Sequence, residues 1–214
     1  MAQSQEIARA LCAAHGWSKS RIHLIPIDTK GDIQLDQALS EVGGKGLFTQ
    51  ELENRLLSGG LDFAVHSLKD LPTQDTDGLC VAAIPPREDV RDALILTPAL
   101  KGIKNLEDLP SQTKFGTASL RRQAQSLRLN PDLDIGLLRG NVGSRISRLT
   151  QSNENTNAIA ATLLAMAGLK RLGLSERVDK IMPIDQMLPA PGQGALAVQT
   201  RKDDAELIEL LKPC

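Results

Sequence analysis

The chain of 214 residues is poor in aromatic side chains: it has three Phe, one Trp and no Tyr. Proteins that bind single-stranded nucleic acid stack bases on interleaved aromatic rings, so this composition argues against that class. The formal net charge of −1 argues against a general nucleic-acid binder, because such proteins carry an excess of Lys and Arg. We therefore expect no nucleic-acid partner.

Cysteine and histidine are equally scarce. The three cysteines, Cys12, Cys80 and Cys214, lie far apart, and no CxxC spacing occurs. This spacing argues against both a disulfide framework and a zinc knuckle. The three histidines also lack the spacing of metal ligands, so we expect no metal site.

Long apolar runs are missing as well. No stretch of eighteen apolar residues is present, so the sequence predicts no membrane span and no membrane partner. The first ten residues, MAQSQEIARA, do not show a basic region followed by an apolar core, which is the pattern of a secretory signal. We expect a soluble, cytoplasmic protein that is a monomer.

Basic residues are concentrated in one part of the chain. Residues 1–86 contain seven basic and eleven acidic side chains, whereas residues 111–149 contain seven basic and two acidic ones. Six of those seven are Arg, whose planar fork matches a carboxylate or a phosphate. The cluster predicts a local anion site, although charge alone fits a solvated helix face equally well.

Short apolar segments alternate with helical patterns along the chain. Strands are predicted at 22–27, 62–68 and 80–84 and again in the second half, and helices include 120–129, 143–149 and 163–172. This alternation is typical of an α/β fold with mainly parallel sheets.

The segment FGTASLRR (115–122) runs from a predicted strand through Gly and hydroxyl residues into a helix. Free backbone N–H groups at a helix start favour anions, and Thr117 and Ser119 add hydrogen-bonding groups. Ser119 is also an ordinary helix cap. A cap does not require Arg121 and Arg122 in the first turn, where the helix dipole disfavours cations. The pattern therefore indicates an anion site.

The segment LRGNVGSR (138–145) repeats this arrangement at the next predicted strand end. The carboxyl ends of parallel strands share one edge of a sheet, so we expect the two loops to lie at the same edge. Neither loop matches GxxxxGK[ST] or GxGxxG, so a nucleotide is not the favoured anion.

The segment AVHSLKDLP (64–72) ends a predicted strand in polar residues. One interpretation is a catalytic carboxylate at a sheet edge. The other is a turn with a structural pair between Lys69 and Asp70, which contributes little when exposed. His66 is interpreted as a structural residue.

Seven segments, which together cover almost the whole chain, resemble hydroxymethylbilane synthases (porphobilinogen deaminases) in the order of that family. They are VGGKGLFTQELE (42–53), HSLKDLPT (66–73), REDVRDAL (87–94), GTASLRRQAQ (116–125), LRGNVGSRISRL (138–149), AGLKRLG (167–173) and LPAPGQGALAVQTR (188–201). The resemblance implies a transferase of tetrapyrrole and haem biosynthesis. Such an enzyme joins four porphobilinogen molecules into hydroxymethylbilane and releases ammonia at each step.

The resemblance also implies the architecture. It predicts two lobes of the periplasmic-binding-protein type around a central cleft, and a smaller third domain that is absent here. Domain 1 would consist of residues 1–86 and 187–214, and domain 2 of residues 92–183, with hinge segments at 87–91 and 184–186.

Site residues follow from the same resemblance. Asp70 would be the catalytic acid beside the pyrrole nitrogens. Ser67 and Lys69 would bind carboxylates of the substrate or cofactor. Acetate and propionate groups of the cofactor and growing chain would be bound by Thr117, Ser119, Arg121, Arg122, Arg139 and Arg145. The other expected substrate- or cofactor-binding residues are Gly140, Asn141, Arg171, near the substrate, and Gln193, at the cleft.

Some expected family features are missing. The family's dipyrromethane cofactor is attached to a cysteine of the third domain, and none of the three cysteines here matches that position. The family's first strand, with an Arg and a Ser, is also not matched. We therefore expect a fragment that is inactive alone. The alternatives are a non-catalytic two-lobed binding module for a small polycarboxylate, which would not need Asp70, and a ligand-sensing domain of a transcription regulator.

Overall fold

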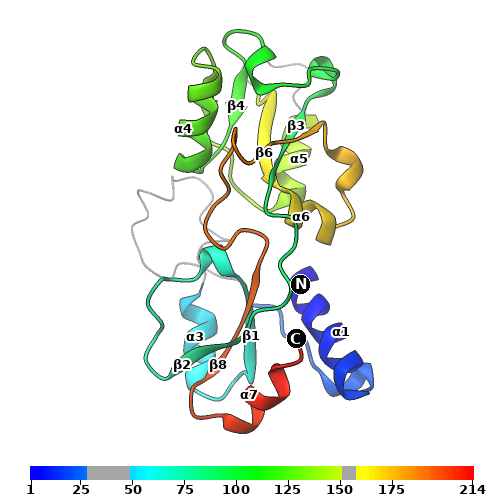
Figure 1. Ribbon diagram of the computed structural model, residues 1–214, viewed down its shortest axis with the longest axis vertical. Coiled ribbons are helices and arrows are strands. Elements are labelled where there is room, and N and C mark those ends of the chain that lie inside the picture. The colour runs from blue at the N-terminus through cyan, green and yellow to red at the C-terminus, as the bar shows by residue number, and fades with distance from the viewer. Residues whose placement is uncertain (28–48, 151–157) are drawn as a thin grey trace. The chain divides into compact units, whose positions relative to one another are not determined.

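The computed structural model describes residues 1–27, 49–150 and 158–214, which form an α/β protein (Figure 1). The described residues make two compact units. The first consists of residues 1–27, 49–88 and 194–214, and the second of residues 89–150 and 158–193. Both ends of the chain therefore belong to the first unit.

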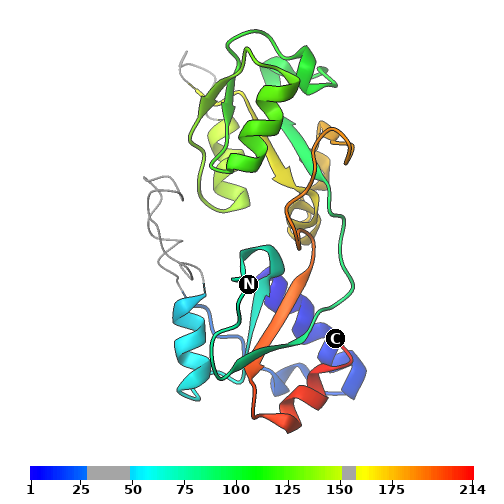
Figure 2. The same cartoon turned by 60° about the vertical axis from the view of Figure 1, so that its left-hand side comes forward.

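A three-stranded antiparallel sheet forms the middle of the first unit. β8 (Leu196–Arg201) lies between β1 (Phe63–Ser67) and β2 (Leu79–Ala83), as Figure 2 shows. The first five residues of β8 are buried, as expected for a strand with a partner on each side and helices on both faces.

Helices cover both faces of this sheet. α1 (Ala2–His15) and α7 (Ala205–Leu211) pack on one face, and α3 (Gln50–Leu57) packs on the other. The core on the first face consists of Ile7, Leu11, Leu196, Val198 and Leu211. The core under α3 consists of Leu56, Ala64 and Leu79. Two short 3₁₀ turns, at Lys19–Arg21 and Leu68–Asp70, complete the unit among the described residues.

The second unit contains a five-stranded mixed sheet with the order β5-β4-β6-β3-β7. Its strands are β3 (Asp92–Leu96), β4 (Lys114–Gly116), β5 (Asp134–Gly136), β6 (Ala161–Ala165) and β7 (Lys180–Ile181). β4 is parallel to both β5 and β6, whereas β3 is antiparallel to β6 and β7.

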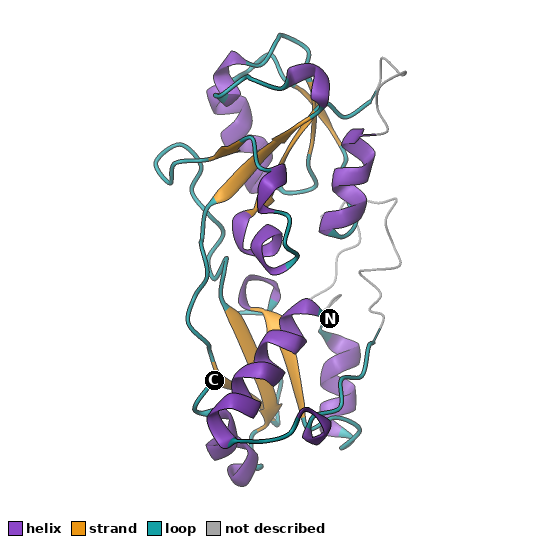
Figure 3. Cartoon of the chain, turned by 90° about the vertical axis from the view of Figure 1, so that its right-hand side faces the viewer, coloured by secondary structure: helices purple, strands orange, loops and turns teal. Residues whose placement is uncertain are grey.

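Successive side chains of β3 point to opposite faces of the sheet, so they contribute to two separate parts of the core of the second unit. Leu94 and Leu96 face the core beneath α4 (Leu120–Leu129). Ala93 and Ile95 face the core beneath α5 (Val142–Thr150) and α6 (Met166–Arg171). The result is a helix–sheet–helix sandwich (Figure 3). Short 3₁₀ turns at Pro98–Leu100, Leu106–Asp108 and Ser175–Arg177 connect these elements.

The α/β class predicted from the sequence is confirmed, but the expectation of mainly parallel sheets is wrong for the described residues. The first sheet is antiparallel, and the second is mixed. The physical reason is that β8 and β6 return beside strands that lie far from them in the sequence. Alternation of elements does not determine the direction of such pairings.

Two predicted elements differ from the structure. The predicted helix at 163–172 is the end of the buried strand β6 followed by the short helix α6. Residues 22–27, predicted as a strand, have no regular structure.

The second unit extends to Gln193, so residues 187–193 belong with it and not, as predicted, with the first domain. Met187 is fully buried in the core under α4, and Leu188 exchanges two hydrogen bonds with Gln125 of that helix. These contacts explain the difference. The predicted hinge segment 184–186 therefore lies inside the second unit, whereas the predicted segment 87–91 contains the change from the first unit to the second. The central cleft stays a prediction.

Candidate functional site

The first polar loop leaves β4 and starts α4. Thr117 is buried, and its Oγ1 accepts a hydrogen bond from the N–H of Ser119 at 3.0 Å. Ser119 is the N-cap, and its Oγ accepts from the N–H of Arg122 at 3.4 Å. Gly116 is required before this loop, because a Cβ there would lie 2.6 Å from Cγ2 of Ile159.

The second polar loop leads from β5 into α5. Gly140 has a φ of 110°, and its carbonyl accepts from Nε of Arg145 at 2.6 Å. The Oδ1 atom of Asn141 accepts from the N–H of Ser144 at 2.9 Å, so this predicted binding residue caps α5. Arg139, which precedes the loop, is only 3% exposed, and Arg145 is half-buried.

The two loops lie at one edge of the second sheet, as the sequence predicted. β4 and β5 are parallel neighbours with Gly116 opposite Gly136, and the N–H of Thr117 donates to the carbonyl of Gly136 at 2.8 Å. β6 is parallel to β4, so α6 starts from the same edge. Arg171, at the end of α6, is half-buried.

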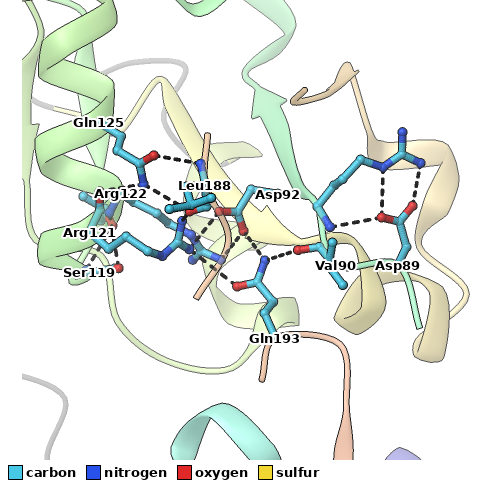
Figure 4. A network of polar contacts seen from close by, with 11 residues as sticks. Asp89, Val90, Asp92, Ser119, Arg121, Arg122, Gln125, Leu188 and Gln193 are labelled. Atoms are coloured by element: carbon cyan, nitrogen blue, oxygen red, sulfur yellow. Dashed lines mark hydrogen bonds and ion pairs between the residues drawn. The ribbon is translucent and has the colours of Figure 1, made fainter. Parts of the chain in front are cut away.

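A buried carboxylate, Asp92, joins three of the predicted site residues (Figure 4). Its Oδ2 accepts from Nη2 of Arg121 at 2.8 Å, and its Oδ1 accepts from Nη2 of Arg122 at 2.8 Å. Nε2 of Gln193 donates to the same Oδ1 at 2.9 Å and to the carbonyl of Val90 at 2.7 Å. The arginine pair is therefore fixed from within the unit.

The charge balance of this network keeps Asp92 ionised. Burial by itself raises the pKa of Asp92, but the charges and hydrogen bonds of Arg122 and Arg121 outweigh it and lower that pKa below its ordinary value. One carboxylate faces two guanidinium groups, so the network keeps one excess positive charge. In addition, Nε of Arg122 is buried and has no hydrogen-bond partner among the described residues.

Sequence reasoning missed Asp92. A detectable signal was present, because Asp92 starts the otherwise apolar strand DALIL. A charge at the end of a fully buried strand requires a partner of opposite sign, and the sequence offers an excess of Arg.

The three remaining site candidates lie in the first unit, at the end of β1. Ser67 is the last residue of β1, and its Oγ accepts from Nε2 of Gln3 at 2.8 Å. Lys69 and Asp70 follow in an exposed 3₁₀ turn. The N–H of Leu68 donates to the carbonyl of Ala195, the residue before β8, and so attaches the turn to the start of that strand.

His66 lies next to these residues but points to the buried side of β1. Its Nε2 donates to Oε1 of Gln199 at 3.1 Å, and Nε2 of Gln199 donates to Oε1 of Glu53 at 3.5 Å. Burial lowers the pKa of His66, although the bond to Gln199 and the charge of Glu53 oppose this shift. A neutral, structural His66 agrees with the interpretation from the sequence.

The described parts of the chain contain no group of three or more His, Cys, Asp or Glu residues that could bind a metal ion. Cys12, Cys80 and Cys214 are free thiols. No helix in the described ranges is both long enough and apolar enough to cross a membrane.

A family model described as porphobilinogen deaminase, dipyromethane cofactor binding domain, matches residues 1–209. The chain belongs to the porphobilinogen deaminase family. This finding confirms the resemblance on which the predicted site residues depend, while the role of each residue stays a prediction.

Curated members of the family support the assignment. The porphobilinogen deaminase of Nitrobacter hamburgensis is 48% identical over 212 residues, which cover 99% of this chain and 64% of that protein. The porphobilinogen deaminase of Campylobacter curvus is 48% identical over 212 residues, which cover 98% of this chain and 64% of that protein. The chain therefore spans just under two thirds of the length of these relatives.

Solved structures support the predicted type of fold. The crystal structure of the methionine-binding protein MetQ aligns with a TM-score of 0.52 at 13% identity, covering 97% of this chain and 83% of that chain. At this identity the likeness concerns the fold alone, and it agrees with two lobes of the binding-protein type.

Proposed function

We propose that this chain provides the substrate-binding and catalytic residues of a hydroxymethylbilane synthase, a transferase of tetrapyrrole and haem biosynthesis. In the reaction, the bond between the aminomethyl carbon of porphobilinogen and its amino nitrogen breaks, and ammonia leaves. That carbon then bonds to a pyrrole carbon of the acceptor, which loses a proton. After four such condensations, water cleaves the bond between the new chain and the acceptor; its hydroxyl group stays on the chain, which leaves as hydroxymethylbilane, and its proton returns to the acceptor carbon. Membership of the family is the observation that carries this proposal.

The arginine-rich edge of the second unit supports binding of the substrate's acetate and propionate groups. The two loops after β4 and β5 start at the same edge, and backbone N–H groups at the starts of α4 and α5 add to the guanidinium groups there. We assign carboxylate binding to Thr117, Ser119, Arg121, Arg122, Arg139, Gly140, Asn141, Arg145, Arg171 and Gln193.

Asp70 is the proposed acid, and Ser67 and Lys69 are proposed to bind carboxylates beside it. An exposed carboxylate in a turn attached to β8 is able to share a proton with the leaving amine. It also stabilises the positive charge that develops on the pyrrole ring when ammonia leaves.

The residues present fit the dipyrromethane that the family model names. This group bears acetate and propionate side chains. The second unit offers an arginine pair with one excess charge and the Nε of Arg122, for which the described residues supply no hydrogen-bond partner. When bound, dipyrromethane supplies the pyrrole carbon to which the first substrate is joined. Thr117, Ser119, Arg121 and Arg122 are the described residues that we expect to contact its carboxylates.

The test is ammonia release from porphobilinogen with and without a soluble dipyrromethane that bears acetate and propionate groups. We expect saturable porphobilinogen binding in both cases, release only with the added acceptor, and loss of release but not of binding in Asp70→Asn. Binding without release under both conditions would favour a polycarboxylate-binding module instead. Absence of porphobilinogen binding would overturn the proposal. The cytoplasmic location and the monomeric state stay predictions.

A further inference from the structure

The outer face of α4 binds the backbone of the segment 186–188 through three side chains. Arg121, Gln125 and Arg128 are spaced by four and three residues, so they lie along one face of the helix. Nη1 of Arg121 and Nε2 of Gln125 donate to the carbonyl of Leu188 at 2.5 and 3.1 Å, and Nη2 of Arg128 donates to the carbonyl of Gln186 at 3.1 Å. Of these three side chains, Arg121 is one of the proposed carboxylate-binding residues.

The two ends of the Arg121 guanidinium have different partners. Nη2 lies 2.8 Å from Oδ2 of Asp92, which is fully buried and ionised. Nη1 donates to the neutral carbonyl of Leu188, a residue that is 62% exposed. The guanidinium is charged in both bonds, but only the bond to Asp92 also joins it to an opposite charge, and that charge is buried, whereas the Leu188 acceptor is a neutral carbonyl of an exposed residue. The attraction of opposite charges is strong away from water, so the Asp92 end is fixed and the Leu188 end is exchangeable.

We propose that Asp92 is a positioning residue for Arg121, and that the Leu188 carbonyl occupies the place of a ligand carboxylate on Nη1. The inference rests on the proposed function, since porphobilinogen supplies the carboxylate. A ligand carboxylate carries a full negative charge, so its attraction to Nη1 exceeds that of the neutral carbonyl, which it displaces. Arg121 keeps its bond to Asp92 throughout, so its guanidinium need not reorient when the ligand binds.

Gln125 then opposes ligand binding. Its Nε2 donates to the Leu188 carbonyl and its Oε1 accepts from the Leu188 N–H at 2.7 Å, so it holds the two peptide groups on either side of the Leu188 Cα. A ligand reaches Nη1 only in those protein molecules in which the Leu188 carbonyl has moved away. The smaller the fraction of such molecules, the weaker the apparent affinity for the ligand. Loss of Gln125 therefore increases affinity.

The test is calorimetric titration of the 214-residue chain with porphobilinogen. We expect Gln125→Ala to lower the dissociation constant by roughly three- to tenfold, the effect of one or two hydrogen bonds. Gln123→Ala is the control, because Gln123 lies two residues away on a different side of the helix and its side chain makes no bond to the segment. This variant should leave the dissociation constant within about twofold of that of wild type. Unchanged or weaker binding by Gln125→Ala, with binding by wild type, overturns this inference alone. No binding by either protein overturns the proposed function as well.

Asp92→Asn separates positioning from simple charge. It removes a negative charge beside Arg121, so electrostatics alone predicts tighter binding of an anion. Positioning predicts the reverse, a dissociation constant raised by roughly tenfold because Arg121 loses its fixed orientation. Tighter binding would refute the positioning role. If circular dichroism shows that this variant does not fold, the comparison of Gln125→Ala with Gln123→Ala decides.

Discussion

Asp92 and Arg122 form a buried ion pair in which Oδ1 and Nη2 lie 2.8 Å apart and the two side chains are 0% and 7% exposed. The partners come from the start of β3 and the first turn of α4. A buried pair is weak evidence of stability by itself, but loss of one partner leaves the other charge uncompensated. This asymmetry makes the pair testable.

Asp92→Asn should lower the free energy of unfolding by about 3–5 kcal/mol, because two guanidinium groups lose their counter-charge. Urea denaturation monitored by circular dichroism measures the change. Asp89→Asn is the matched control: Asp89 pairs with Arg91 at 2.7 Å, but the Arg91 side chain is 43% exposed. We expect a much smaller loss there, and equal losses in the two variants would contradict the distinction.

Acid should destabilise the protein in part through His66. Burial lowers the pKa of His66 in the folded state, so the unfolded chain takes up the proton first, near the ordinary value of about 6.5. Stability from the neutral ring is complete above that value and is lost as the pH falls towards the lowered folded pKa. His66→Gln keeps a donor for Gln199 but does not titrate. Urea midpoints measured between about pH 7.5 and 5.5 should therefore fall less steeply in the variant, and an unchanged slope would count against this role.

Gly140→Ala should destabilise the loop between β5 and α5 more than the same substitution does at a left-handed glycine with free space around it. Its φ is 110°, and an added Cβ would lie 2.4 Å from Oγ of Ser144. Gly173→Ala is the control, because φ is 68° and an added Cβ meets nothing within 4 Å. That change should cost about 1–2 kcal/mol. The midpoint of thermal unfolding should be lower for Gly140→Ala than for Gly173→Ala. Adding Ser144→Ala to Gly140→Ala should recover part of the lost stability. A failure of Ser144→Ala to recover stability would exclude the clash as the cause.

Leu163→Ala tests the packing of β6 in the core beneath α4. Leu163 is 1% exposed and packs in the core beneath α4, so we expect a loss of about 2–5 kcal/mol. Leu172→Ala lies within the same predicted helix but is 48% exposed, and we expect a change within about 0.5 kcal/mol. Comparable effects at both positions would contradict the burial of Leu163 in the core beneath α4.

Elements with a clear local pattern were predictable from the sequence. The predicted helix at 120–129 coincides with α4, because its spacing of apolar residues and its Ser119 cap are both local. The run of apolar residues from Leu163 onward was not predictable, because a short buried strand and a buried helix give the same pattern. Pairing with β3 and β4 makes residues 161–165 a strand.

The sequence by itself determined that two arginine-rich loops follow two consecutive strands, because the Gly, polar and Arg residues of each loop lie close together in the chain. Only the tertiary structure decided which charges pair. Asp92 binds Arg122 thirty residues away and Gln193 a hundred and one residues away. The physical reason is that local spacing governs helices, caps and turns, whereas the partner of a buried charge is chosen by the packing of distant segments around it.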